Sequence, residues 1–339
     1  MGRERLRRLV RGEADARPAW LPLPAGFLGR LGGATYADLV ADPTRLFNAL
    51  RDAVRLLGAD AAVVLPDPTL LAAAAGARLT CPDPNRLPRM ADHPWAQDLP
   101  SVLPRDVASR GGLGVALETC RRLRAADPDI GVALAVAGPT ILALQLRGPR
   151  FADEVAADDE ASHDCLDLAG QLVLQAVRAA GEIGADLLVV LETALPGRGG
   201  DVRADAWRPV VNLAGFYGMP VLTVPITPLT DATDSAAGTL SEGTLRGVAE
   251  ALADLPAWAL VTPIETSGPI TVTAPAAAPH RLAGLTATVL GAQPSTLEAR
   301  LDELVSSGAH ALSTARPLDH GTNLNGLMTV KTWLERPRP

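Results

Sequence analysis

Eight short apolar runs recur along the chain, and segments with helical periodicity separate them. The runs cover residues 18–24, 60–66, 131–137, 185–192, 219–225, 257–263, 285–291 and 309–315. Each has the length of a strand and ends close to a proline, a glycine or an acidic residue, which is typical of parallel strands buried on both faces. Eight such strands with helices between them favour a closed barrel over an open sheet. We therefore predict an α/β fold, a (β/α)8 TIM barrel.

The segments between the runs support this prediction. Residues 44–58 and 164–184 carry apolar residues three and four positions apart, and both segments close on a glycine, a common helix-ending residue. The alternation continues along all 339 residues, so we expect one domain over residues 1–339. Aromatic residues make up only 3% of the chain, so the core is expected to consist of alanine, valine and leucine.

Four long segments are rich in proline or polar residues, and we predict that they form lid-like loops, or in the case of the first a surface excursion. They are residues 81–112, 195–207, 226–243 and 264–281. Each lies in the connection that follows a predicted strand. Such connections meet at the C-terminal face of a barrel, where TIM-barrel enzymes have their active sites.

The formal net charge of −7 argues against a nucleic-acid partner, which requires a surplus of basic residues. One basic cluster is predicted to be a solvated helix face; it comprises Arg3, Arg5, Arg7, Arg8 and Arg11. No apolar run is long enough to span a bilayer, and the first residues lack the apolar segment of a signal peptide. We expect a cytoplasmic protein with a small-molecule substrate and with neither nucleic acid nor membrane as a partner.

The few cysteines and the single lysine restrict the chemistry. Cys81, Cys120 and Cys165 are odd in number and far apart, which indicates neither a disulfide framework nor a zinc ribbon. His163 and Cys165 lie in a helical segment, about 200° apart around its axis, so they are not expected to share a metal. Lys331 is the only lysine and lies in the last predicted helix, which argues against Schiff-base chemistry.

Several segments, in the same order along the chain, resemble the uroporphyrinogen decarboxylase family. Residues 56–80 are similar to the segment in which a strand ends at the family's functional aspartate, here Asp67. Residues 179–194 resemble the family's fourth strand with its acidic end, here Glu192. The first strand, the third strand with its Gly-Pro turn, and the closing strand with its asparagine-containing loop are also similar (17–26, 136–148 and 312–330).

The resemblance implies one of two activities. One branch of the family contains cofactor-free decarboxylases of acidic tetrapyrroles. A second branch contains methyltransferases that move a methyl group from a corrinoid to a zinc-bound thiol. That branch needs a His-x-Cys pair at the end of the fifth strand and a cysteine at the end of the eighth, where this chain reads VLTVPITP and STARP. The expected zinc ligands are therefore missing.

The decarboxylase pattern is altered as well. Leu23 and Phe27 occupy the positions of two arginines that hold substrate carboxylates in the family. Their loss removes charge-assisted hydrogen bonds worth about 1.5–3 kcal/mol each, so uroporphyrinogen itself is not the expected substrate. The family's tyrosine after the third strand falls at Gln145, and the histidine of its last strand falls near Arg316.

Polar residues at the carboxyl ends of the strands are the candidate site residues. We predict catalytic roles for Asp67, Glu192 and His320, the last because the ordinary pKa of histidine suits proton transfer. The predicted substrate-binding residues are Leu23, Phe27, Gln145, Thr193, Glu265 and Arg316. No metal ligand and no cofactor are predicted.

Each main candidate also has a structural alternative. Asp67 can instead cap the helix that follows it. Glu192 can form an ion pair with Arg198 or Arg203 at the barrel mouth. Arg316 can pair with an acidic residue of its own loop, Asp319.

Decarboxylation leaves an electron pair on carbon and therefore needs an electron sink. Without zinc ligands or a suitable lysine, the substrate must supply the sink, while Asp67 stabilises the developing positive charge. We expect a metal-free lyase that acts on a small carboxylated or heteroaromatic metabolite and, as is common in the family, forms a homodimer. A related methyltransferase and a barrel that binds a ligand without catalysis are the alternatives.

Overall fold

The computed structural model describes residues 2–11, 13, 17–193, 200–226, 259–264 and 282–336. Eight parallel strands form its centre: β1 (Ala19–Leu21), β2 (Ala61–Val64), β5 (Gly131–Ala137), β6 (Leu187–Glu192), β7 (Val221–Pro225), β8 (Ala259–Ile264), β9 (Leu282–Leu285) and β10 (Ala311–Thr314). Along the sheet they follow the order β1-β10-β9-β8-β7-β6-β5-β2.

The two strands at the ends of this order, β1 and β2, meet through Asp60. The backbone N–H of Asp60 donates to the carbonyl of Trp20, with an N–O distance of 2.9 Å. The backbone N–H of Trp20 donates in return to the Asp60 carboxylate, also at 2.9 Å. These bonds join the first strand to the second, and the fold is the predicted (β/α)8 TIM barrel.

Seven of the eight predicted strands are confirmed, and the prediction for residues 285–291 is wrong. The strand there is β9, and residues 287–290 form helix α12 (Ala287–Leu290). Thr286 ends the strand because its hydroxyl accepts the N–H of Val289 and so caps the helix. Within β9, a Cβ on Gly284 would lie 2.6 Å from Val261, so the packing favours a glycine that interrupts the apolar signal.

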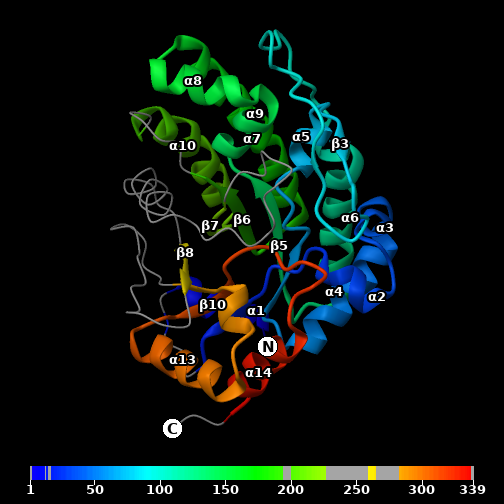
Figure 1. The fold of residues 1–339 in the computed structure, drawn as a ribbon, viewed down its shortest axis with the longest axis vertical. Coiled ribbons are helices and arrows are strands. Elements are labelled where there is room, and N and C mark those ends of the chain that lie inside the picture. Colours follow the sequence, from blue (N-terminus) through cyan, green and yellow to red (C-terminus); the bar gives the residue numbers. More distant parts are fainter. Residues whose placement is uncertain are drawn as a thin grey trace.

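Helices surround the barrel (Figure 1). The longer ones are α4 (Pro43–Leu57), α6 (Gly111–Ala126), α9 (Glu160–Ile183), α10 (Gly200–Phe216), α13 (Pro294–Ser306) and α14 (Leu324–Leu334). Shorter helices follow strand ends: α2 (Phe27–Gly32) and α3 (Tyr36–Ala41) after β1, α5 (Leu70–Ala74) after β2, and α7 (Pro139–Arg147) and α8 (Pro149–Ala157) after β5. These shorter helices therefore belong to the C-terminal face of the barrel.

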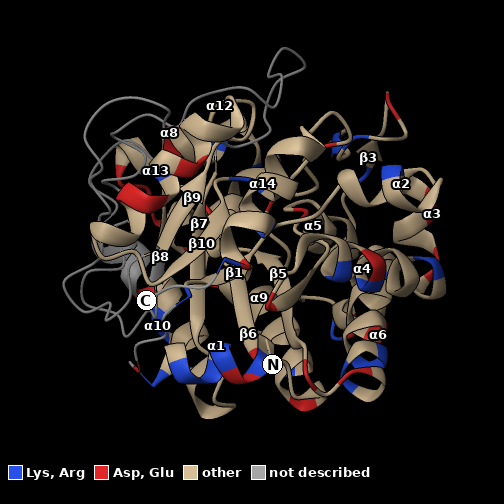
Figure 2. Ribbon diagram, turned by 90° about the horizontal axis from the view of Figure 1, so that it is seen from below, with Lys and Arg blue, Asp and Glu red and all other residues tan. Residues whose placement is uncertain are grey.

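Helix α1 (Gly2–Val10) lies across the opposite end of the strands (Figure 2). Its Arg3 pairs with Asp186, with an N–O distance of 2.8 Å, and its Arg5 pairs with the buried Asp60 at 2.5 Å. Arg17 adds a second ion pair to Asp60 at 2.7 Å. The prediction of a solvated basic face is thus wrong for Arg3 and Arg5, because these arginines neutralise the partly buried Asp186 and the buried Asp60 at the base of the barrel.

The predicted lid of residues 81–112 is an excursion with little regular structure. It includes strand β4 (Arg89–Met90), which pairs antiparallel with β3 (Leu79–Thr80). It also includes the short 3-10 helix η1 (Val107–Ser109). The second predicted loop is wrong from Gly200 onward, where α10 begins. The remaining predicted lids, after β7 and β8, lie almost entirely outside the described residues.

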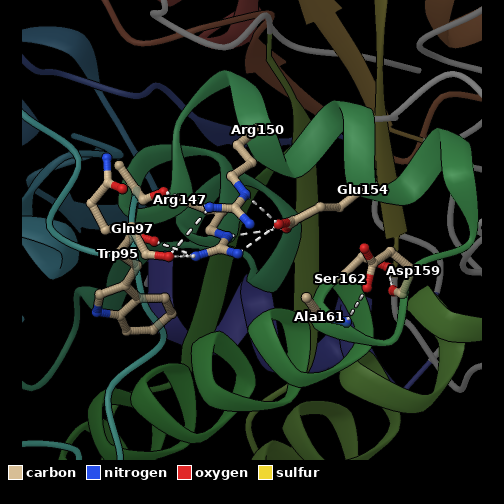
Figure 3. Close-up of polar contacts among 9 residues, drawn as sticks. Trp95, Gln97, Arg147, Arg150, Glu154, Asp159, Ala161 and Ser162 are labelled. Atoms are coloured by element: carbon tan, nitrogen blue, oxygen red, sulfur yellow. Dashed lines mark hydrogen bonds and ion pairs between the residues drawn. The ribbon is translucent and has the colours of Figure 1, made fainter.

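The excursion is fixed to the end of α7 by a buried arginine (Figure 3). Arg147 is 3% exposed and forms a bidentate ion pair with Glu154 of α8, at 2.5 and 3.0 Å. Its remaining nitrogen donates to the carbonyls of Trp95 and Gln97, at 2.5 and 3.3 Å. Because each nitrogen of the guanidinium donates to a partner within the fold, Arg147 serves to anchor the excursion.

Within the part of the chain that the structure describes, no helix has the length and apolar character needed to cross a membrane.

Candidate functional site

Asp67 lies three residues beyond β2, between two prolines, and only 1% of its surface is exposed. Its Oδ1 accepts two hydrogen bonds from Thr69, from the backbone N–H at 2.8 Å and from the hydroxyl at 2.7 Å. Its Oδ2 accepts the hydroxyl of Tyr36 at 2.7 Å. All three donors are neutral, so they orient the carboxylate without cancelling its charge.

A tight turn places Asp67 at this point. Leu65 has a φ of 42°, in the left-handed region that a branched side chain rarely adopts, and its carbonyl accepts the N–H of Asp67 at 2.7 Å. The Asp67 side chain then closes the turn by bonding two residues ahead, to Thr69. Thr69 is the N-cap residue of α5, and its N–H and hydroxyl both donate to Asp67, so Asp67 also supports the start of this helix.

Burial controls the protonation of Asp67 and of its hydrogen-bond partner Tyr36. Desolvation raises the pKa of Asp67 above its ordinary value, while the hydrogen bonds from Thr69 and Tyr36 lower the pKa and only partly offset the rise. Burial, together with the nearby Asp67 charge, raises the pKa of Tyr36 well above its ordinary value. The phenol therefore keeps its proton, and Asp67 binds a proton more readily than an exposed aspartate does.

Glu192 is the last residue of β6, and it is buried. Its Oε1 accepts the N–H groups of Ile141 and Thr193, at 3.0 and 2.8 Å. Its Oε2 accepts the N–H of Thr140 at 3.2 Å and the indole N–H of Trp207 at 3.0 Å. The carboxylate thus occupies the N-terminus of α7 and joins it to α10, a position favoured by the helix dipole.

The side chain of Glu192 fits against α7 only because residue 138 has none. A Cβ on Gly138 would overlap Oε2 of Glu192 and lie 2.8 Å from its Cδ. The alternative ion pair with Arg198 or Arg203 involves side chains outside the described residues.

Asp67 and Glu192 lie on the same rim of the barrel. β5 lies between β2 and β6 in the sheet, and Val64 of β2 pairs with Leu134 of β5. Ala137, the last residue of β5, pairs with Leu191, the residue before Glu192. Strands lie about 4.8 Å apart, so the two acidic residues follow backbones separated by about 10 Å. We define these strand ends and α7 as the candidate site.

Helix α7 also carries two polar side chains with buried oxygen atoms. The hydroxyl oxygen of Thr140 and Oε1 of Gln145 have no hydrogen-bond partner among the described residues. Buried polar atoms of this kind are uncommon in proteins and indicate a bound water or another polar group. Gln145 is 8% exposed, and Thr193, which follows Glu192, is buried as well.

The two apolar replacements of the family's arginines lie in the core. Leu23 and Phe27 have no exposed surface, so in this structure they line no open cavity. The backbone around them pairs with the closing segment, because Leu318 N–H donates to Leu23 O at 2.8 Å and Phe27 N–H donates to Leu318 O at 3.2 Å.

The closing segment carries the remaining candidates. Arg316 and Asp319 are partly buried, and the Asp319 carboxylate accepts the hydroxyl of Thr322 at 3.1 Å. The side chain of His320 is exposed. Glu265 lies outside the described residues.

Three residues of the site did not emerge from the sequence. Tyr36, Gly138 and Trp207 each contact one of the two predicted acids. Two signals in the sequence point to them. Tyrosine and tryptophan are rare in this chain, with two and five residues, and Gly138 belongs to the Gly-Pro pair at which α7 starts.

The zinc of the methyltransferase branch does not fit the strand ends that would hold it. β7 is followed by the buried Ile226 and β10 by the buried Ala315, and neither offers a zinc ligand. Among the described residues, no group of three or more His, Cys, Asp or Glu could hold a metal ion. His163 pairs at 3.6 Å with Asp158, whereas burial raises the pKa of Cys165 to about 12.

Comparisons with known proteins agree with this architecture. The model of the family Uroporphyrinogen decarboxylase (URO-D) matches residues 1–207, and the chain belongs to this family. A solved structure, a methyltransferase from Methanosarcina mazei, is similar with a TM-score of 0.80 over 98% of both chains. The sequence identity is 17%, so this likeness shows the fold alone. The comparison with curated proteins finds no match.

Proposed function

We propose that this protein is a lyase of the decarboxylase type that acts on a small carboxylated or heteroaromatic metabolite, with Asp67 as its central acid. One observation carries the proposal: a carboxyl group buried at a strand end of the barrel, with a raised pKa and three neutral hydrogen-bond donors. A carboxyl group of this kind suits general acid chemistry near neutral pH better than an exposed aspartate does.

The proposed reaction replaces CO2 by a proton. Protonated Asp67 donates its proton to the ring carbon that bears the carboxylate, and the resulting cation is stabilised by the Asp67 anion. The carbon–carbon bond then breaks, its electron pair returns to the ring, and CO2 leaves. Asp67 finally recovers a proton from solvent. The substrate supplies the electron sink, so the step needs no oxidant or reductant.

The surroundings of Asp67 limit the substrate. Asp67 is 1% exposed, so a substrate reaches it only after the side chains that cover it move. The core positions of Leu23 and Phe27 offer no charge to a carboxylate. In the proposal Arg316 binds the substrate carboxylate, and the amide of Gln145 contacts a polar group. This arrangement suits a smaller and less acidic molecule than a tetrapyrrole.

The test is a search for CO2 release from pools of small carboxylated aromatic compounds, with uroporphyrinogen as a substrate that should not react. Asp67→Asn keeps the size of the side chain and should lower the rate about 10²- to 10⁴-fold. Asp52→Asn, an exposed substitution on α4, is the matched control and should retain the rate. A rate in Asp67→Asn equal to that of the wild type contradicts the proposal.

The second candidate function is methyl transfer, supported by the likeness to the Methanosarcina mazei methyltransferase. The strand ends do not provide the zinc ligands of that branch, so the thiol would need another means of activation. Metal analysis of the purified protein and a titration with cobalamin, followed by its absorption spectrum, test this candidate. Bound zinc or a spectral change favours methyl transfer over decarboxylation.

A further inference from the structure

Tyr36 makes a contact that the resemblance to the family does not assign. It is the first residue of α3, it is 1% exposed, and its hydroxyl donates to Oδ2 of Asp67 at 2.7 Å. The two residues are 31 positions apart in sequence and belong to elements that follow different strands, β1 and β2. The contact is therefore a product of the tertiary fold.

The fold holds Tyr36 in place from its own side. Thr35 and Asp38 form a reciprocal capping box around it, with N–O distances of 3.1 and 2.9 Å. The loop before the cap turns at Gly33, whose φ is 61°. The backbone N–H of Ala34 then donates to the carbonyl of Gly29 at 3.1 Å. The hydroxyl thus reaches Asp67 from a fixed backbone, which reduces the entropy lost in making the bond.

Within the described part of the chain, few groups act on the Asp67 carboxylate. Thr69 donates to Oδ1, and Tyr36 donates to Oδ2. The thiol of Cys81 is close enough to interact with both Asp67 and Tyr36, and burial together with the charges of Asp83 and Asp67 raises its pKa. Tyr36 is therefore the only one of these groups that both titrates and donates a hydrogen bond to Asp67.

We propose that Tyr36 is a positioning residue for Asp67: its hydroxyl holds Oδ2 in place and stabilises the ionised carboxylate, and so sets the pH range over which Asp67 takes up and returns its proton. The consequence for catalysis rests on the proposed function. The effect on Asp67 does not, because it follows from the hydrogen bond itself.

A merely structural role for Tyr36 predicts something different. In that case the buried ring fills space, and the loss of its hydroxyl changes stability but not the titration of Asp67. Tyr36→Phe keeps the ring and removes only the hydroxyl, so it separates the two roles. The other tyrosine of the chain, Tyr217 of the turn after α10, provides a matched control, Tyr217→Phe.

The first measurement follows the infrared C=O band of the protonated Asp67 carboxyl group against pH, identified by its absence in Asp67→Asn. In Tyr36→Phe the midpoint should shift to higher pH, since a bond that favours the ionised form is gone. In Tyr217→Phe the midpoint should equal that of the wild type. An unshifted midpoint in Tyr36→Phe overturns the proposal.

The second measurement leaves Tyr36 intact. Tyr217→Phe makes Tyr36 the only tyrosine, so tyrosinate absorbance then reports on it alone. Adding Asp67→Asn removes the nearby negative charge, and Tyr36 should ionise at lower pH. An unchanged titration overturns the proposal.

Neither measurement uses a substrate, so the role of Tyr36 and the proposed function can fail separately. A shifted titration without any CO2 release rejects the proposed function alone. CO2 release with unshifted titrations rejects the role of Tyr36 alone.

Discussion

Gly138 and Glu192 are complementary in shape: the carboxylate of Glu192 occupies the space that a side chain at residue 138 would fill. Because of this fit, the acid at the end of β6 reaches the first turn of α7. The backbone of Gly138 has a φ of −75° and a ψ of 169°, which any residue can adopt. The glycine is therefore required for space rather than for conformation.

Gly138→Ala should consequently destabilise the protein through overpacking, by about 1–3 kcal/mol. Urea unfolding measures the loss. Gly215→Ala is the control, since an added Cβ meets nothing within 4 Å at this exposed position of α10. That substitution should stabilise the helix by about 0.5–1 kcal/mol. Equal effects of the two substitutions would show that the space beside Glu192 is not restrictive.

Glu192→Gln should also destabilise the protein. The new amide nitrogen would face two N–H donors, either those of Thr140 and Trp207 or those of Ile141 and Thr193. Buried donors left without an acceptor cost about 1–3 kcal/mol, which urea unfolding can resolve. Glu182→Gln, an exposed change near the end of α9, should leave stability unaltered. A stable Glu192→Gln would mean that α7 does not depend on this cap.

The barrel could be predicted because parallel strands buried on both faces leave a local pattern in the sequence. β5 is seven consecutive buried residues that end at a Gly-Pro pair, and a pattern of this kind needs no knowledge of distant contacts. The sequence did not predict β9 because this strand has only four residues and one of them is Gly284. The neighbouring run of residues 285–291 has the stronger apolar signal and was therefore predicted as the strand.

The site could be predicted only in part, for the same reason. Asp67 lies three residues beyond β2 and Glu192 is the last residue of β6, so the strand pattern alone places them on the rim. Their partners Tyr36 and Trp207 reach them from α3 and α10, and those contacts depend on how helices pack around the barrel. Nor does an apolar residue after a strand show from sequence whether it lines a pocket or, like Leu23, fills the core.

Arg147→Lys should loosen the excursion of residues 81–112. A lysine has one ammonium group and cannot reproduce the bidentate pair with Glu154 together with the bond to the carbonyl of Trp95. We expect a loss on the order of 2 kcal/mol and faster deuterium exchange at residues 93–97. Arg150→Lys is the control, since Arg150 pairs with the same Glu154 but is 54% exposed. Exchange that is unaffected by Arg147→Lys would show that other contacts hold the excursion.

The pH dependence of stability should reveal the raised pKa of Asp67. The folded protein binds this proton more tightly than the unfolded chain, whose aspartate has the ordinary pKa of 3.8. Between 3.8 and the folded pKa, the folded state therefore holds more protons, and stability falls as the pH rises. Above the folded pKa this contribution is constant. The stability of the wild type relative to Asp67→Asn should thus be greatest in acid and decline towards neutral pH.

Asp42 should show the opposite dependence of stability on pH. Its carboxylate accepts the N–H of Thr44 at the start of α4, and this bond lowers its pKa. Its stabilising contribution is present above the unfolded pKa and is lost as the pH falls, so the wild type should gain relative to Asp42→Asn towards neutral pH. Urea unfolding of the three proteins across this range gives both differences. If the stability difference between the wild type and Asp67→Asn stays constant or rises with pH, burial does not dominate the protonation of Asp67. The acid at the centre of the proposed reaction would then lack the raised pKa on which the proposal depends.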